Sequence, residues 1–400
     1  MDAAPRAAGK PPANHVGPLP WVKLRSAASG HQLFKRMMDV VDPRARPGDV
    51  VMVYDKSDAP YGLALYNPKS LVSLRLMHRG RYDGDLDQFF AERIKAALEL
   101  RRGLYNLDKT TDAYRVVHDM GDGLPGIVID RYADVFVLDY YSLGMFQQSA
   151  RIERAIKALV PEAVFVKRAS DHNQSMEGFS LKPAAPVKRK ITENGVQFEV
   201  MPSGGYKTGF FCDQRDNRQA FAGLAAGKRV LDVCSYTGGF GIYAMKNGGA
   251  RETTCVELDP DNVAMLKRNA NINNVRIDAV QVDAFPYLRQ KAVADDRYDL
   301  VVLDPYKLIN SAETYDFGRK KYNDLNRLGM SCVAKGGLLV TCSCSGLLPW
   351  PDFQQMVRTA AGSAGRRVQI LRKSGAGIDH PVAVDHPEGE YLKVLWARVL

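Results

Sequence analysis

Two cysteines, Cys342 and Cys344, stand two residues apart where an apolar run of the sequence ends. The run, residues 337–340, has the composition of a buried strand, and the serines and glycine that follow it indicate a loop. A thiol in this position is a small buried hydrophobe, a metal ligand, a disulfide partner or a nucleophile. Residues i and i+2 of one strand are poorly placed to bridge each other, and the chain has no C-x-x-C pair, which disfavours a zinc site. Of these four roles, packing in the core and nucleophilic attack remain for the two thiols.

Acidic residues follow three of the apolar segments in the same half of the chain. Glu257, Asp283 and Asp304 each come directly after a run that has the composition of a strand. Strands alternating with helices predict a parallel sheet covered on both faces, and ligands bind beyond the carboxyl ends of its strands. The sequence therefore predicts an α/β domain whose site lies where these acids are. The expected strands are residues 229–233, 252–257, 279–282, 300–303 and 337–341.

A glycine-rich turn follows the first of these strands, with Ser235, Tyr236, Gly238 and Gly239 in it. Glycines let the backbone approach a ligand closely, and the helix that follows offers free N–H groups. Glu257, about twenty residues further on, is placed to accept hydrogen bonds from ribose hydroxyls. The turn also fits a loose dinucleotide fingerprint, so an NAD-dependent dehydrogenase is one alternative.

The later strand ends argue against NAD. Asp283 is placed to meet an adenine amine, and Asp304 is followed by Pro305. An acid at three successive strand ends, the last in an Asp-Pro pair, is the layout of an S-adenosylmethionine (SAM) methyltransferase. SAM is therefore the expected cofactor.

The whole chain has the composition of an ordinary globular protein, with 46% apolar and 25% charged residues over 400 positions. No apolar run approaches the roughly 18 residues of a membrane-spanning helix, so no membrane partner is expected. Six cysteines without a secretory signal indicate a reducing compartment, and we expect a cytoplasmic protein. The formal net charge of +10 points weakly to nucleic acid.

Three globular parts are expected after a Pro- and Ala-rich tail that we predict to be disordered. Residues 21–76 have short strands punctuated by Gly and Pro, which is typical of a small barrel, and helical periodicity follows at 86–103. The middle part has strands at 114–118, 126–130, 135–140 and 163–167 and a helix at 146–159. A loop at 171–190 comes before an Asn194-Gly195 hairpin. The expected boundaries are 1–20 for the tail, then 21–100, 101–202 and 203–400.

Several segments together resemble one family, the bacterial 23S rRNA cytosine-C5 methyltransferases of the large-subunit methyltransferase I type. The resemblance covers the chain from about residue 21 and is most specific in its last two hundred residues. The matching segments are residues 205–216, the Ser235–Phe240 turn, Asp304-Pro305-x-Lys307, residues 322–326, residues 343–347, Asp379-His380-Pro381 and residues 387–393.

The resemblance implies an RNA-binding PUA β-barrel, a middle α/β domain with a strand–strand–helix–strand–strand layout, and a Rossmann-like class I methyltransferase domain with a mostly parallel seven-stranded sheet. The implied partner is 23S rRNA, or another structured RNA with an accessible single-stranded target base; a homodimer stays open. Three positions depart from the family: His31 is followed by Gln-Leu instead of Pro-Trp, Tyr306 replaces a proline, and Ala284 stands where a second acid is common. The implied SAM-binding residues are Arg215, Ser235, Tyr236, Gly238, Gly239, Glu257, Asp283 and Asp304.

The same resemblance implies a catalytic role for the Cys344 thiol. C5 of cytosine is a poor nucleophile, and adding a thiolate to C6 makes C5 reactive, so covalent catalysis splits one hard step into easier ones. Cys344 occupies the family's nucleophile position, and Lys307 is the candidate cation that makes the thiol acidic. Asp304 is the candidate partner of the cytosine amino edge. The base that removes the C5 proton is not assigned.

Two further functions remain as alternatives. A methyltransferase acting on guanine N7 or on an exocyclic amine needs no covalent adduct, so Cys344 discriminates against it. An RNA-binding protein with an inactive catalytic domain gains weight from Tyr306, and SAM binding would discriminate against it.

Overall fold

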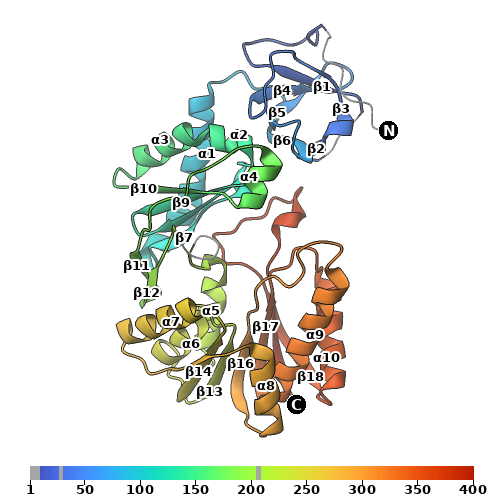
Figure 1. The fold of residues 1–400 in the computed structure, drawn as a ribbon. Coiled ribbons are helices and arrows are strands. Elements are labelled where there is room, and N and C mark those ends of the chain that lie inside the picture. Colours follow the sequence, from blue (N-terminus) through green and yellow to red (C-terminus); the bar gives the residue numbers. More distant parts are fainter. Residues whose placement is uncertain (1–9, 27–29, 204–208) are drawn as a thin grey trace. The chain divides into compact units, whose positions relative to one another are not determined.

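The computed structural model describes residues 10–26, 30–203 and 209–400 (Figure 1). By its contacts the chain forms two compact units. The first contains the chain up to Arg189 together with residues 200–210 and 379–389, and the second contains residues 190–199, 211–378 and 390–400. Within the described residues, no helix is long and apolar enough to cross a membrane.

The amino-terminal part of the first unit is a six-stranded sheet in the order β2-β6-β5-β4-β1-β3, which confirms the small β domain expected there. Strand residues alternate between two apolar cores, and one face packs around Val22, Leu33, Val51 and Leu74. The strands are β1 (Trp21–Leu24), β2 (Gln32–Phe34), β3 (Met38–Val41), β4 (Val50–Tyr54), β5 (Pro60–Tyr66) and β6 (Val72–Arg79).

The segment before β1 is structured where it is described. His15 Nδ1 lies 3.0 Å from the Tyr54 hydroxyl, and its ring also stands against Trp21. The sequence predicts a disordered tail over residues 1–20, whereas His15 within that range contacts the sheet through these rings. Residues 1–9 lie outside the described part.

The middle part has a four-stranded sheet in the order β10-β9-β8-β7, and its strand order corrects the expected layout. Three strands come before α2 and α3 and one follows, as the apolar pattern predicted, whereas the layout implied by the resemblance has two strands on each side. The expected helix at 146–159 is two helices, because a turn at Gln148, with ψ of 4°, interrupts it. The elements are α1 (Leu86–Glu99), β7 (Ala113–His118), β8 (Ile127–Tyr132), β9 (Val135–Tyr140), α2 (Leu143–Gln147), α3 (Ser149–Leu159) and β10 (Val164–Arg168).

A short helix, α4 (Asp171–Glu177), lies where a loop was expected. Ser170 caps its start by accepting a hydrogen bond from the Asn173 amide, and Gly178 ends it in the left-handed conformation. Seven mostly polar residues give no apolar periodicity, so this helix depends on tertiary contacts. The buried Glu177 carboxylate supplies one of them, since it accepts a 2.6 Å hydrogen bond from Arg75 of β6.

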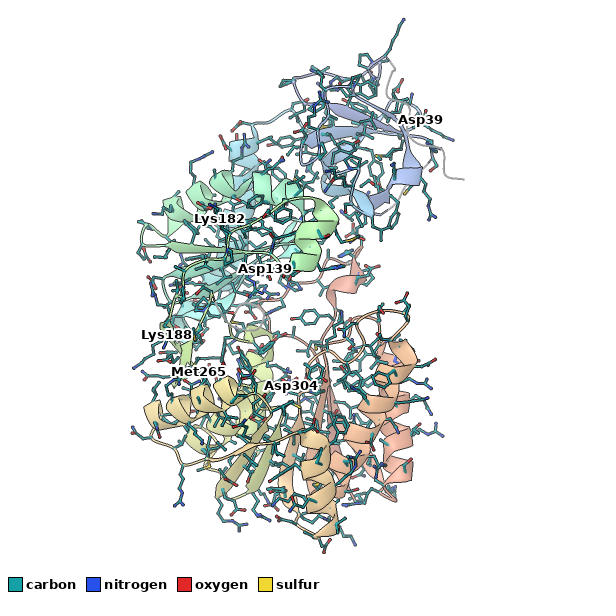
Figure 2. All side chains as sticks on the ribbon, viewed as in Figure 1. Asp39, Asp139, Lys182, Lys188, Met265 and Asp304 are labelled. Atoms are coloured by element: carbon teal, nitrogen blue, oxygen red, sulfur yellow. The ribbon has the colours of Figure 1, made fainter. Side chains whose placement is uncertain are left out.

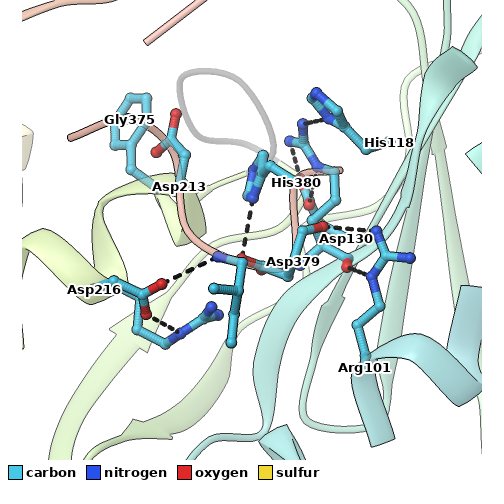
Figure 3. Close-up of polar contacts among 12 residues, drawn as sticks. Arg101, His118, Asp130, Asp213, Asp216, Gly375, Asp379 and His380 are labelled. Carbon is cyan, nitrogen blue, oxygen red and sulfur yellow. Dashed lines mark hydrogen bonds and ion pairs between the residues drawn. The ribbon is translucent and has the colours of Figure 1, made fainter. Parts of the chain in front are cut away.

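The loop between β18 (Val368–Ser374) and β19 (Lys393–Val399) contains residues 379–389, which belong to the first unit. Asp379, in this loop, is fully buried; its carbonyl oxygen accepts a 2.7 Å hydrogen bond from Arg101, and its carboxylate accepts one of 2.8 Å from the Arg115 amide (Figure 3). Arg101 also forms a 2.5 Å ion pair with Asp122. The Asp379-His380-Pro381 motif is thus a buried polar anchor within this unit.

The second unit has a seven-stranded sheet in the order β15-β14-β13-β16-β17-β19-β18, in which only β19 runs antiparallel to its neighbours. This confirms the mostly parallel α/β sheet. Its strands are β13 (Arg229–Val233), β14 (Glu252–Glu257), β15 (Asp278–Gln281), β16 (Tyr298–Leu303), β17 (Val333–Ser343), β18 (Val368–Ser374) and β19 (Lys393–Val399).

Helices cover both faces of this sheet, and each face has its own apolar core (Figure 1). Strand residues alternate between the two cores, as Leu231 and Val230 of β13 do. The switch in strand order falls between β13 and β16, so the predicted ligand edge is at their carboxyl ends. The helices are α5 (Arg215–Ala222), α6 (Gly239–Lys246), α7 (Pro260–Ile272), α8 (Ala284–Val293), α9 (Tyr315–Ser331) and α10 (Trp350–Ser363).

The hairpin expected at Asn194-Gly195 is confirmed. It joins β11 (Arg189–Glu193) to β12 (Val196–Val200), and both turn residues have positive φ, 49° and 80°. Asparagine and glycine tolerate these angles better than other residues, which is why the dipeptide predicts a type I′ turn.

Candidate active site

The turn after β13 is held in an unusual backbone conformation. Cys234, Tyr236 and Gly238 have φ of 62°, 50° and 88°, so three of five successive residues are left-handed. The Gly238 amide donates a 2.8 Å hydrogen bond to the Ser235 carbonyl oxygen, which closes the turn directly before α6. Non-glycine residues in this region are strained, and such strain concentrates where a backbone must meet a ligand.

Asp232, at the end of β13, was not among the predicted site residues. One carboxylate oxygen accepts a 2.9 Å hydrogen bond from the Gly241 amide, while the other is buried and has no hydrogen-bond partner among the described residues. Burial, together with the charges of Asp304 and Glu257, raises the pKa of Asp232 to about 7. An acid inside an apolar strand, just before a glycine turn, is the sequence signal that could have identified it.

Glu257 ends β14, as predicted, and its carboxylate orients the glycine turn. It accepts hydrogen bonds from the Tyr236 amide at 2.9 Å and from the Leu258 and Asp259 amides at 3.0 Å each. A carboxylate has about four acceptor positions, so one remains for a ligand hydroxyl. The acid therefore both shapes the turn and remains able to bind.

Asp283 follows β15 and Asp304 follows β16, on either side of the β14 and β13 ends. Asp283 is exposed and caps α8, accepting a 2.8 Å hydrogen bond from the Phe285 amide. Asp304, labelled in Figure 2, is half-buried. Its amide donates a 3.2 Å hydrogen bond to the Val233 carbonyl oxygen, which places Asp304 beside the glycine turn that follows β13. After burial, its charge contributes to the raised pKa values of Asp232, Cys234 and Cys342.

The two cysteines have different surroundings. Cys342 lies on β17, is fully buried in the core on the α5–α6 side, and burial raises its pKa well above the ordinary range. Cys344 comes directly after β17, is partly exposed, and its Sγ lies 4.0 Å from the Pro305 carbonyl oxygen. A thiol must reach both solvent and substrate to react, and Cys344 meets the first condition.

Polar contacts fix the loop that carries Cys344. Ser345 Oγ accepts a 3.2 Å hydrogen bond from the Ile309 amide and lies 3.1 Å from the Tyr322 hydroxyl of α9. The Ser345 carbonyl oxygen accepts a 3.0 Å hydrogen bond from the Lys393 ammonium. The sequence places Tyr322 and Lys393 in segments that match the family but predicts no role for either, because each is far from Cys344 in the sequence.

The remaining predicted residues follow β16 or begin α5. Lys307 is half-buried and makes no hydrogen bond or ion pair with the described residues, and Tyr306 is 62% exposed. Arg215 begins α5, is buried, and forms a 3.2 Å ion pair with Asp216. Residues 205–208 of the matching segment before it lie outside the described residues.

The geometry fits a SAM site. A strained glycine turn at a helix start, three strand-end carboxylates and an unused buried oxygen of Asp232 offer hydrogen-bond acceptors to a ligand that carries hydroxyl, amine and ammonium groups. The partly exposed thiol of Cys344 at the same edge adds a nucleophile.

Comparisons with known proteins agree with this geometry. Residues 166–368 match the model of the S-adenosylmethionine-dependent methyltransferase family, and residues 23–79 match that of the PUA-like domain. The chain is 37% identical to ribosomal RNA large subunit methyltransferase I of Aeromonas salmonicida (strain A449), over 92% of this chain and 94% of that protein. It is 35% identical to the protein of the same name from Alteromonas mediterranea, with the same coverage.

Solved structures show the same fold along almost the whole chain. A protein assigned as a SAM-dependent methyltransferase from Streptococcus mutans superimposes with a TM-score of 0.78 at 24% identity, covering 94% of this chain and 99% of that one. A second structure, of a protein assigned as a methyltransferase and solved with SAH, has a TM-score of 0.78 at 23% identity with the same coverage. At these sequence identities the structural similarity shows only that the fold is shared.

Proposed function

Because this chain belongs to the ribosomal RNA large subunit methyltransferase I family, we propose that it methylates C5 of a cytosine in 23S rRNA, with Cys344 as the nucleophile. The observation that carries the proposal is the contrast between the two thiols. Cys344 is partly exposed beside Pro305 at the ligand edge of the sheet, whereas Cys342 is buried in the core.

The cofactor is SAM, which supplies an electrophilic methyl group when bound. The backbone of Ser235, Tyr236, Gly238 and Gly239 would hold it, together with the carboxylates of Glu257, Asp283 and Asp304 and with Arg215. Asp232 joins this set because one of its buried oxygens lacks a partner among the described residues. The left-handed turn supports this assignment, since it brings backbone groups to the surface of the site.

Cys344 would act first on the base. Its thiolate adds to C6, forming an S–C6 bond, and the electron pair of the C5=C6 bond makes C5 nucleophilic. Asp304 would hold the cytosine amino group by a hydrogen bond. After C5 has been methylated, loss of its proton to a base restores the C5=C6 bond and expels the thiolate. Cys344 is thereby regenerated.

The substrate would be an unpaired base of a folded RNA, because C6 of a stacked base is out of reach. The PUA-like segment at residues 23–79 supports RNA binding, and it carries the exposed cations Lys35 and Arg36. We propose the cytoplasm as the place of action, in keeping with six free cysteines.

Trapping of the covalent intermediate tests this function. RNA containing 5-fluorocytosine cannot lose its C5 substituent as a proton, so a protein–RNA adduct should accumulate in the presence of SAM. Cys344→Ala should abolish both the adduct and turnover, while Cys342→Ala, the matched control, should retain both. An adduct that persists in Cys344→Ala would contradict the assignment. Methylation with neither thiol would favour transfer to nitrogen.

A further inference from the structure

We propose that Lys393, and not Lys307, is the cation that stabilises the Cys344 thiolate. The inference rests on the proposed function, since it assigns a positioning residue to the same nucleophile. Lys393 would act through Cys344, without contact to the reacting base.

Lys393 is a buried cation without an acidic partner in the part of the chain that the structure describes. Its side chain is at the start of β19, and the residue is 2% exposed. The ammonium donates hydrogen bonds to the carbonyl oxygens of Ser345 at 3.0 Å and Tyr391 at 2.7 Å. Two neutral carbonyls compensate a buried charge only in part, so a nearby anion would stabilise Lys393.

The strand register brings this ammonium to the loop that carries the nucleophile. β19 runs antiparallel to β17, and Lys393 pairs with Ser343, the residue before Cys344. The hydrogen bond to the Ser345 carbonyl oxygen then ties the ammonium to the residue after Cys344. Lys393 thus contacts the backbone on one side of the thiol and is the strand partner of the residue on the other.

The electrostatics agree with this geometry. Burial lowers the pKa of Lys393, and negative charge on Cys344 and on Glu390 acts in the opposite direction. Since such coupling is mutual, a charged Lys393 favours the thiolate of Cys344. The thiolate in turn supplies the anion that the buried ammonium lacks.

Apart from Lys307 and the ion-paired Arg215, the ionisable groups named around Cys344 are acids, a thiol and phenols. Burial and the charge of Cys344 raise the pKa of Tyr322 on α9 to about 12, so it is neutral at pH 7. Asp304 beyond β16 and Asp213 before α5 raise the pKa of the neighbouring Cys342. Tyr391 donates a 2.6 Å hydrogen bond to Asp213, and Glu390 is exposed. A negative or neutral group cannot lower the pKa of a thiol by charge.

Lys307, the cation expected from the sequence, lacks comparable support. It is half-buried and makes no hydrogen bond or ion pair with the described residues, so nothing holds its ammonium beside the thiol. It serves instead as the matched control.

The test is the pH dependence of Cys344 alkylation in the full-length protein, without RNA. Iodoacetamide reacts with the thiolate, and mass spectrometry of the peptide that contains Cys344 gives the rate at each pH. In the wild type we expect a midpoint clearly below 8.5, the ordinary value for a thiol. Lys393→Met should raise the midpoint by about one pH unit or more. At a pH below the midpoint, this corresponds to a thiolate fraction about tenfold smaller than in the wild type. Lys393→Arg should restore it, and Lys307→Met should leave it unchanged.

A wild-type midpoint at or above 8.5 would overturn the inference even if every Lys393 variant failed to fold. So would an unchanged midpoint in a folded Lys393→Met protein, or a shift caused by Lys307→Met instead. The 5-fluorocytosine experiment decides the proposed function separately. If the midpoint is low and depends on Lys393 but no RNA adduct forms, Lys393 still stabilises the thiolate and the proposed reaction is wrong.

Discussion

The main-chain N–H of Arg115 on β7 donates a 2.8 Å hydrogen bond to the carboxylate of Asp379, a residue 264 positions later in the chain. Asp379 is fully buried, and its carboxylate also lies 3.1 Å from Nδ1 of His380 (Figure 3). One buried carboxylate therefore ties a late segment of the chain to the main chain of β7.

Asp379→Ala should lower the stability of the first unit, because it leaves buried donors without an acceptor. A buried group that loses its partner costs about 1–3 kcal/mol. Asp385→Ala is the control: this acid belongs to the same loop and pairs with His31, but its side chain is 53% exposed, so its loss should cost less than about 1 kcal/mol. Thermal unfolding measures both, and equal losses would contradict the buried-anchor account.

Asp232 should make the stability of the protein depend on pH. Its pKa is raised to about 7 in the folded chain, above its unfolded value, so the folded state holds a proton that the unfolded state has lost. Stability should therefore fall as the pH rises from about 4 to 7, by up to roughly 4 kcal/mol. Asp232→Asn removes this titration. Its melting temperature should decline less over that range than the wild type's, and parallel curves would refute the assignment.

Glu257→Ala should weaken SAM binding at least about tenfold, because a hydrogen bond to a charged group is worth roughly 1.5–3 kcal/mol and the carboxylate also holds the Tyr236 amide. Glu252→Ala is a matched control, since Glu252 begins the same strand and its side chain is exposed. Isothermal titration with SAM measures both dissociation constants. An unchanged constant for Glu257→Ala would remove this residue from the site.

Tyr306→Ala should raise the KM for RNA and leave SAM binding unchanged. The residue is 62% exposed, so its ring is available to stack on a base, and such stacking is worth about 1–3 kcal/mol. Tyr306→Phe keeps the ring and should behave like the wild type. If Tyr306→Ala instead improves KM, the ring crowds the base.

Lys35→Glu should weaken RNA binding and reduce its dependence on salt, because a lost phosphate contact releases fewer counterions. Lys157→Glu makes the same charge change at an exposed position on α3 and should have little effect. Filter binding at several salt concentrations distinguishes the two. Deleting residues 1–100 is a poorer test, since Phe90 and Ile94 of α1 share a core with β7 and β8. Equal effects of both lysine variants would argue against RNA contact by the β domain.

Local chemistry determined much of this protein from the sequence. Apolar runs separated by helical stretches predicted the parallel sheet, because side-chain periodicity depends only on near neighbours. Asn194-Gly195 predicted its turn for the same reason. The residues directly after each strand could be named, since parallel strands end at one edge, and Cys344 could be preferred to Cys342 through its place in the loop and its match to a family.

Tertiary structure alone decided which distant groups meet. Lys393 reaches the loop of Cys344 because β19 returns antiparallel beside β17, a pairing that no local pattern encodes. The raised pKa of Asp232 comes from burial together with carboxylates on two other strands. Asp379 packs against β7 although it is sequentially far away. Each depends on long-range register and burial, which act only after the chain has folded.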